Sequence, residues 1–177
     1  MIKIRNGMFE TNSSSVHSIV VSNEPLNKNC IPSFAYFELG EYGWSMGVIK
    51  DDWGRASYFY TAACILREHD VRDEIIELLA PLGIDCIFDE ENPPLYTIYE
   101  GSNYKYLENG NIDHVDECQD FVDTLMSDGE ALARFIFDDR SFIVTGNDNC
   151  DEIDYNWAQD KVAKADKYLH TTFYKGN

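Results

Sequence analysis

The segment RASYFYTAACILR, residues 55–67, places apolar and aromatic side chains on nearly every side of a helix. A helix at a protein surface keeps a polar face, so this pattern predicts a helix that other elements cover all round. Tyr58, Tyr60 and Cys64 are expected to face the core. The chain has 177 residues and is 44% hydrophobic, enough to enclose such a helix in one domain spanning residues 1–177.

Four further segments have the apolar spacing of helices. Residues 71–82 carry an apolar face and end at a Pro and a Gly, and residues 116–126 and 129–137 are separated by the sequence SDG. Residues 155–173 have lysines toward the C-terminal end, where they suit the helix dipole. The core candidates of these helices are Val71, Ile75, Leu78, Leu79, Leu82, Phe121, Leu125, Leu132, Phe135 and Ile136.

Short β-branched and aromatic runs between these helices predict strands. They cover residues 3–6, 16–22, 34–39, 95–99, 103–107 and 141–145. The pair 95–99 and 103–107 flanks a Gly-Ser-Asn turn and predicts a hairpin. Because strands and helices do not alternate as regular βαβ units, we expect an α+β fold, with a mostly antiparallel sheet packed against about four to five helices.

The charge of the chain is strongly negative and unevenly distributed. The formal net charge is −18, which opposes direct binding to nucleic acid. Residues 108–160 hold fifteen acidic and two basic residues. Such a stretch is either a solvated surface or one that competes with nucleic acid for a basic groove. The candidate partner-binding acids are Asp116, Glu117, Asp120, Asp123, Asp138 and Asp139.

The cysteines and the hydropathy indicate the compartment. Five cysteines without a CxxC pair favour a reducing cytoplasm over a disulfide scaffold. No apolar run approaches the roughly 18 residues of a membrane helix, and the opening MIKIRNGMFETNSSS has no apolar signal core. We therefore expect a soluble cytoplasmic protein without a membrane partner.

A zinc site is the metal centre that the residue types favour. His114 and Cys118 lie four residues apart and share a face if a helix begins at His114, and both are good zinc ligands. His17 and Asp148 complete the candidate ligand set. Side chains that could orient these ligands are Asn12, Ser13, Ser15 and Asp113. The alternatives are a capped turn around residue 12 and an unliganded acidic loop around residue 148.

Known catalytic signatures are missing from the sequence. There is no Gly-rich phosphate loop, GxSxG elbow, HExxH pair or dinucleotide fingerprint. Ser13 or Ser15 with His17 is a poor nucleophile and base pair, because residues two or four apart on a turn and strand rarely make the required hydrogen bond.

The opening RNGMFETNSSSVHSI resembles that of a group of small, mostly uncharacterised phage and prophage proteins. GEYGWS, RASYFYTA, NIDH and SFIVTGNDN follow in the same order, so the resemblance covers most of the chain. It implies a mobile-element origin and puts His17, Asp113, His114 and Asp148 within shared motifs, with Cys118 and Cys150 beside them. It implies no reaction.

A second resemblance is one of type: small, strongly acidic phage proteins include anti-CRISPR inhibitors that keep DNA from an RNA-guided nuclease. We therefore expect an inhibitor that binds such a host nuclease or another basic nucleic-acid-binding protein through a DNA-mimicking surface, with a bound zinc ion that would stabilise its fold. The rival hypothesis is a metal-dependent hydrolase or nucleotide-acting enzyme, with His114 and Asp148 as ligands and Asp113 orienting the imidazole. A third is an acidic structural protein of the virion.

Overall fold

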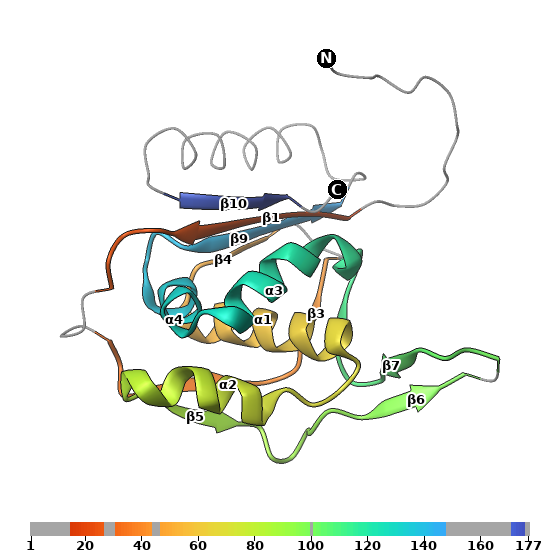
Figure 1. Cartoon of the computed structure of the whole chain (residues 1–177). Coiled ribbons are helices and arrows are strands. Elements are labelled where there is room, and N and C mark those ends of the chain that lie inside the picture. The colour runs from red at the N-terminus through yellow and green to blue at the C-terminus, as the bar shows by residue number, and fades with distance from the viewer. Residues whose placement is uncertain (1–14, 27–30, 44–46, 100, 148–170, 176–177) are drawn as a thin grey trace, which may run out of the picture.

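Helix α1 (Asp52–Arg67) lies at the centre of the fold (Figure 1). The side chain of Asp51 caps its first turn by accepting a hydrogen bond from the Gly54 N–H, 2.7 Å away. Every residue from Arg55 to Cys64 is buried, which confirms the interior helix that its apolar pattern predicts. The computed structural model describes residues 15–26, 31–43, 47–99, 101–147 and 171–175.

Four antiparallel strands form the main sheet, in the order β10-β1-β9-β4. Their bounds are β1 (Ser15–Ser22), β4 (Gly47–Ile49), β9 (Phe142–Asn147) and β10 (Thr171–Lys175). His17 pairs with Thr145, and Ile19 pairs with Ile143. Strand β1 is therefore hydrogen bonded along both edges, and His17 lies inside the sheet with no exposed surface.

The helices form a layer beneath this sheet (Figure 1). They are α2 (Arg72–Leu79), the 3₁₀ turn η1 (Ala80–Leu82), the 3₁₀ turn η2 (Val115–Cys118), α3 (Gln119–Ser127) and α4 (Gly129–Phe137). Helix α4 begins at Gly129, whose Cα lies so close to the Leu78 carbonyl that a Cβ would collide with it. Among the described helices, none is long and apolar enough to cross a bilayer.

Three small strand pairs complete the architecture. Strands β2 (Phe34–Phe37) and β5 (Asp85–Phe88) are parallel, as are β3 (Glu41–Tyr42) and β8 (Asn111–Ile112). Strands β6 (Tyr96–Ile98) and β7 (Lys105–Leu107) form an antiparallel hairpin that projects from the body (Figure 1). The protein is thus an α+β fold of the expected class, with two parallel pairs beside the antiparallel sheet.

Most of the predicted elements that fall on described residues are present, whereas the strand expected at residues 3–6 and residues 155–170 of the last expected helix lie outside the described residues. The hairpin and the helices near residues 71–82, 116–126 and 129–137 are confirmed, and the core candidates are buried or partly buried. Two expectations were wrong at their boundaries. Helix α3 begins at Gln119, because His114 has a left-handed backbone (φ 56°) and 3₁₀ turn η2 intervenes. Residues 171–173 belong to β10, where β-branched and aromatic side chains suit an edge strand beside β1.

Candidate functional site

The structure brings several predicted site residues into one region. His17 comes from β1, Asp113 and His114 follow β8, and Cys118 ends η2. Asp113 and His17 both approach Gly43 closely, and His114 Nε2 lies 4.0 Å from an Asp113 carboxylate oxygen, so these three side chains are neighbours. Of the other predicted site residues, Asn12, Ser13 and Asp148 lie outside the described residues, and only the backbone position of Ser15, on β1, is described.

A tyrosine hydroxyl links His17 to Cys118. Oη of Tyr58, on α1, lies 3.0 Å from Nδ1 of His17 and 3.5 Å from Sγ of Cys118. His17 and Tyr58 have no exposed surface and Cys118 is 1% exposed. We call Asp113, His17, Tyr58 and Cys118 the buried polar chain, because three of these side chains are enclosed in the core and Asp113, 24% exposed, lies at the outer end.

The short β3–β8 pair positions Asp113 at the other end of this chain. The Asp113 N–H donates to the Tyr42 carbonyl across 3.1 Å, which continues the ladder by one residue. Gly43 follows with a φ of +108°, and a Cβ there would lie 2.9 Å from Asp113 Cβ and 3.0 Å from His17 Nε2. Glycine is therefore required for both the backbone conformation and the close approach of the imidazole.

Burial keeps the imidazole neutral. Desolvation lowers the pKa of His17 to about 4, although the Asp113 charge and a hydrogen bond to the Asp113 backbone act in the opposite direction. The neutral imidazole carries one ring proton, and its Nδ1 shares a hydrogen bond with the Tyr58 hydroxyl. Burial, followed by the neighbouring Cys118, raises the pKa of Tyr58 well above its usual value. The Tyr58 hydroxyl therefore stays protonated.

The described part of the predicted zinc site is not arranged as a metal centre. The Tyr58 hydroxyl contacts both the His17 imidazole and the Cys118 thiol, and His114 Nε2 lies 4.0 Å from an Asp113 carboxylate oxygen. No group of three or more His, Cys, Asp or Glu side chains within the described ranges could hold a metal ion. Since Asp148 lies outside those ranges, the zinc site stays a prediction, which metal analysis of the wild type and His114→Ala would test.

The shared face expected for His114 and Cys118 is not formed. His114 precedes η2 in a left-handed conformation, and its side chain is 33% exposed, whereas Cys118 is buried. The helical spacing of four residues therefore does not apply, because the chain between them is not α-helical from His114 onward.

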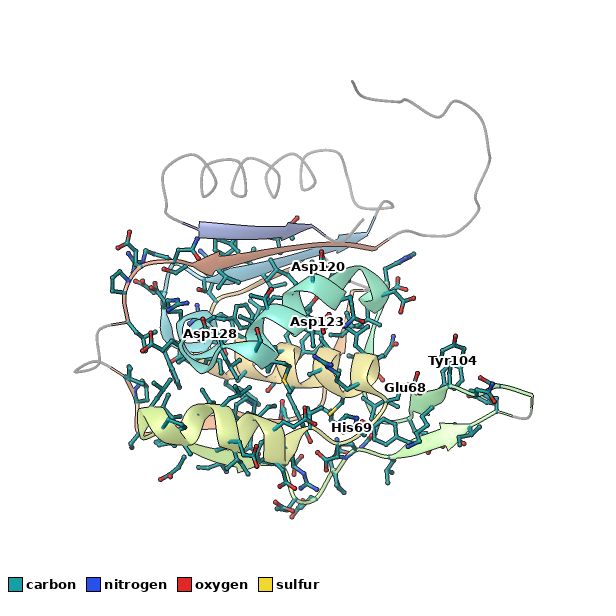
Figure 2. All side chains as sticks on the ribbon, in the orientation of Figure 1. Glu68, His69, Tyr104, Asp120, Asp123 and Asp128 are labelled. Atoms are coloured by element: carbon teal, nitrogen blue, oxygen red, sulfur yellow. The ribbon has the colours of Figure 1, made fainter. Side chains whose placement is uncertain are left out.

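Exposed carboxylates line the outer side of η2 and α3. Asp116, Asp120 and Asp123 are exposed, while Phe121, Val122 and Leu125 on the opposite side of α3 are buried in the core. We call these three carboxylates the acidic face. Figure 2 shows Asp120 and Asp123 following one another along α3, with Asp128 at the junction to α4. Arg67 and Gln119 each donate to Asp123 at 2.9 Å, so its charge is partly balanced.

The other predicted partner-binding acids differ in how much side-chain surface they expose to a partner. Arg140 donates to both carboxylate oxygens of Asp138, at 2.8 and 2.6 Å. Burial opposes ionisation of Asp138, but the hydrogen bonds from Arg140 outweigh it and lower the pKa to about 2. Its side chain is 10% exposed, which leaves little surface for a partner. Asp139 is exposed, and the side chain of Glu117 is not among those described.

Two residues of this region were missed by the sequence analysis. Tyr58 was assigned to the core for its ring alone, and the role of its hydroxyl has no signature in a helical pattern. Gly43 lies in the motif GEYGWS, but its close approach to His17 depends on long-range packing that the motif does not indicate. Comparison with protein-family models, curated proteins and solved structures finds no significant match to this chain.

Proposed function

We propose that this protein is a competitor of nucleic acid, which binds a basic nucleic-acid-binding partner through the acidic face. The partner that the resemblances favour is an RNA-guided nuclease of the host, which the protein would keep from loading DNA. The observation that carries the proposal is the row of exposed carboxylates formed by Asp116 on η2 and by Asp120 and Asp123 on α3.

The spacing of this row supports charge mimicry. A rise of about 1.5 Å per residue separates Asp120 from Asp123 by roughly 4.5 Å along α3, whereas each DNA strand carries one charge per about 3.4 Å of axis. The row is thus sparser than a DNA strand, but the net charge of −18 adds a long-range attraction toward a basic groove. Binding should therefore weaken steeply as salt is added.

The enclosure of the buried polar chain favours a binding protein over an enzyme. Its imidazole, hydroxyl and thiol are enclosed, and its histidine is neutral with no exposed surface. A catalytic base or nucleophile must reach its substrate within hydrogen-bond distance. These groups instead hold β1, α1 and η2 together beneath the acidic face, so we assign them a structural role.

The proposal is tested by competition with DNA. Purified protein is titrated into a guide-loaded RNA-guided nuclease and its fluorescent DNA target, and DNA binding is measured at several salt concentrations. We expect inhibition to saturate near one protein per nuclease, because a binding inhibitor must match its target in amount. Inhibition at trace amounts would indicate an enzyme and contradict the proposal.

A matched pair of variants separates the acidic face from net charge. Asp116→Lys with Asp120→Lys reverses two exposed acids four residues apart, and Asp73→Lys with Glu77→Lys makes the same change on α2. We expect inhibition to weaken at least about tenfold in the first variant and about threefold or less in the second. Equal losses would mean that only the total charge matters, and the proposed face would be wrong.

A further inference from the structure

A groove separates the projecting hairpin from the body of the protein. It has a volume of about 460 Å³ and lies between β7 on one side and the end of α1 with η2 on the other. Tyr104 and Tyr106 line it from the hairpin, and Glu68 and Asp116 line it from the body. Figure 2 shows Glu68 at the end of α1 and Tyr104 farther out along the hairpin. Asp116 also belongs to the acidic face, so the groove continues that face.

The two tyrosines present unusually exposed rings. Tyr104 is 66% exposed and Tyr106 is 45% exposed. Tyr99, on the same hairpin, packs edge-on against Tyr106 with ring centroids 4.9 Å apart. This contact fixes the orientation of the Tyr106 ring, so the face of the ring is positioned for a cation before any ligand is bound. Aromatic rings of this kind attract cations over their faces.

The carboxylates of the groove are positioned by the fold. Glu68 ends α1 in a left-handed conformation, with φ of 57°. One of its carboxylate oxygens accepts a hydrogen bond from the Lys105 N–H at 3.2 Å, which ties the hairpin to α1. Asp116 is exposed on the neighbouring turn. Since Lys105 is the single base in the lining, the two acids leave the groove with a net negative charge.

We propose that this groove receives an arginine side chain of the basic partner, an inference that rests on the proposed function. A guanidinium group is planar, stacks on aromatic faces and pairs with carboxylates through two parallel hydrogen bonds. Tyrosine rings beside two carboxylates match both properties. An ammonium group of lysine is more strongly hydrated and does not stack, so the groove discriminates in favour of arginine. The arginine serves as an anchor beside the less specific attraction of the acidic face.

The experiment compares two peptides of equal charge on the full chain. Acetylated and amidated hexa-arginine and hexa-lysine, each carrying a fluorophore, are titrated at low salt and followed by fluorescence polarisation. The wild type is expected to bind hexa-arginine at least about threefold more tightly. Tyr104→Leu with Tyr106→Leu keeps apolar bulk but removes both rings. It should weaken hexa-arginine binding about threefold to tenfold and change hexa-lysine binding by less than about twofold.

Two control variants sharpen the comparison. Trp53→Leu removes an exposed aromatic ring, 52% accessible, that does not line this groove, so binding of both peptides should stay within about twofold of the wild type. Lys105→Gln removes the opposing charge, so hexa-arginine binding should tighten about twofold or more. Thermal melts of each variant confirm that the fold is retained.

The outcomes separate this inference from the proposed function. Equal affinity of the wild type for the two peptides, or an equal loss in Trp53→Leu, overturns the arginine site. The double tyrosine variant keeps all three carboxylates of the acidic face. The competition experiment with DNA therefore tests the proposed function separately from the arginine site. Failure of DNA competition with arginine preference intact would reject the proposed function and leave a groove selective for guanidinium groups.

Discussion

Oη of Tyr58 and Nδ1 of His17 lie 3.0 Å apart in the interior, although 41 residues separate them in the chain. The hydrogen bond connects the central helix α1 to the doubly paired strand β1, and both side chains have no exposed surface. A buried donor and acceptor are costly when either is removed alone, because the group left behind loses water without gaining a partner. The bond is therefore a sensitive point of the fold.

Replacing Tyr58 with phenylalanine tests this bond. Tyr58→Phe keeps the ring and removes the hydroxyl that contacts His17 and Cys118. We expect the free energy of unfolding to fall by about 1 to 3 kcal/mol, measured by urea denaturation at neutral pH. Tyr36→Phe, at a ring that is 37% exposed, is the matched control and should change stability by less than about 0.5 kcal/mol. A loss of the same size in both variants would contradict the assigned role.

The stability of the protein should depend on the protonation of His17. Burial lowers the pKa of His17 from 6.5 to about 4. Between these values the unfolded chain binds a proton that the folded protein does not, so stability falls as the pH falls through this window. The loss is roughly 3 kcal/mol when complete, at 1.36 kcal/mol for each pH unit.

This pH dependence is measured by urea denaturation at several values from about pH 7 to pH 4, together with titration of the histidine resonances by NMR. His17→Leu should flatten the slope in that window. Asp138, whose pKa is about 2, destabilises the protein only in stronger acid, below the window of His17. An imidazole of His17 that titrates near 6.5 would show that the residue is not enclosed as described.

A comparison of two glycines isolates the close packing beside His17. Gly43 and Gly83 both have positive φ, +108° and +74°, so alanine strains the backbone at either position. A Cβ on Gly43 would press on Asp113 and His17, whereas nothing lies within 4 Å of one on Gly83. We expect Gly43→Ala to cost about 2 kcal/mol more than Gly83→Ala in unfolding free energy. Equal costs would show that backbone strain alone explains the glycine at position 43.

Among the described arginines, Arg55 is expected to contribute most to the stability of the protein. Its guanidinium group is enclosed in the core and donates to the carbonyls of Ile136, Asp138 and Ser141 as well as to Asp52. Arg55→Met leaves these carbonyls at the end of α4 without their donor, and we expect a loss of about 3 to 5 kcal/mol. Thermal and urea denaturation measure it.

Arg67 provides the control for this substitution. It pairs with Asp123 at the surface, where both side chains are more than a third exposed. Exposed ion pairs contribute little, so Arg67→Met should cost less than about 1 kcal/mol. If the two variants unfolded at the same urea concentration, the buried guanidinium group would not have the structural role described here.

The sequence predicted those elements in which the pattern of apolar side chains directly indicates which residues are buried. Residues 55–67 are apolar all round and form α1, and the alternating aromatics near Tyr104 and Tyr106 form the hairpin. Strand β5 was missed, because four residues between a glycine turn and an acidic loop are too short for a periodic signal. Strand β10 was missed, because the apolar spacing typical of a helix continues through residue 173. The pairing of β10 with β1 is long-range and overrides this local preference.

The site was predictable in its residue types but not in its partners. His17, Asp113 and Cys118 were singled out because imidazole, carboxylate and thiol groups are chemically versatile. Their common neighbour, Tyr58, lies on a helix whose pattern indicates only burial. Which hydroxyl meets which imidazole depends on how α1 packs beneath the sheet, and packing between distant segments leaves no mark on local sequence.

The order of the main sheet has a consequence for synthesis on the ribosome. Strand β1 is made first, yet both of its neighbours come from residues 142–175. At about 5 to 20 residues per second, its apolar Ile19, Val20 and Val21 wait on the order of ten seconds for the strands that cover them. During that interval the nascent chain exposes an apolar segment, and chaperones that shield such segments should bind β1 until translation reaches β9.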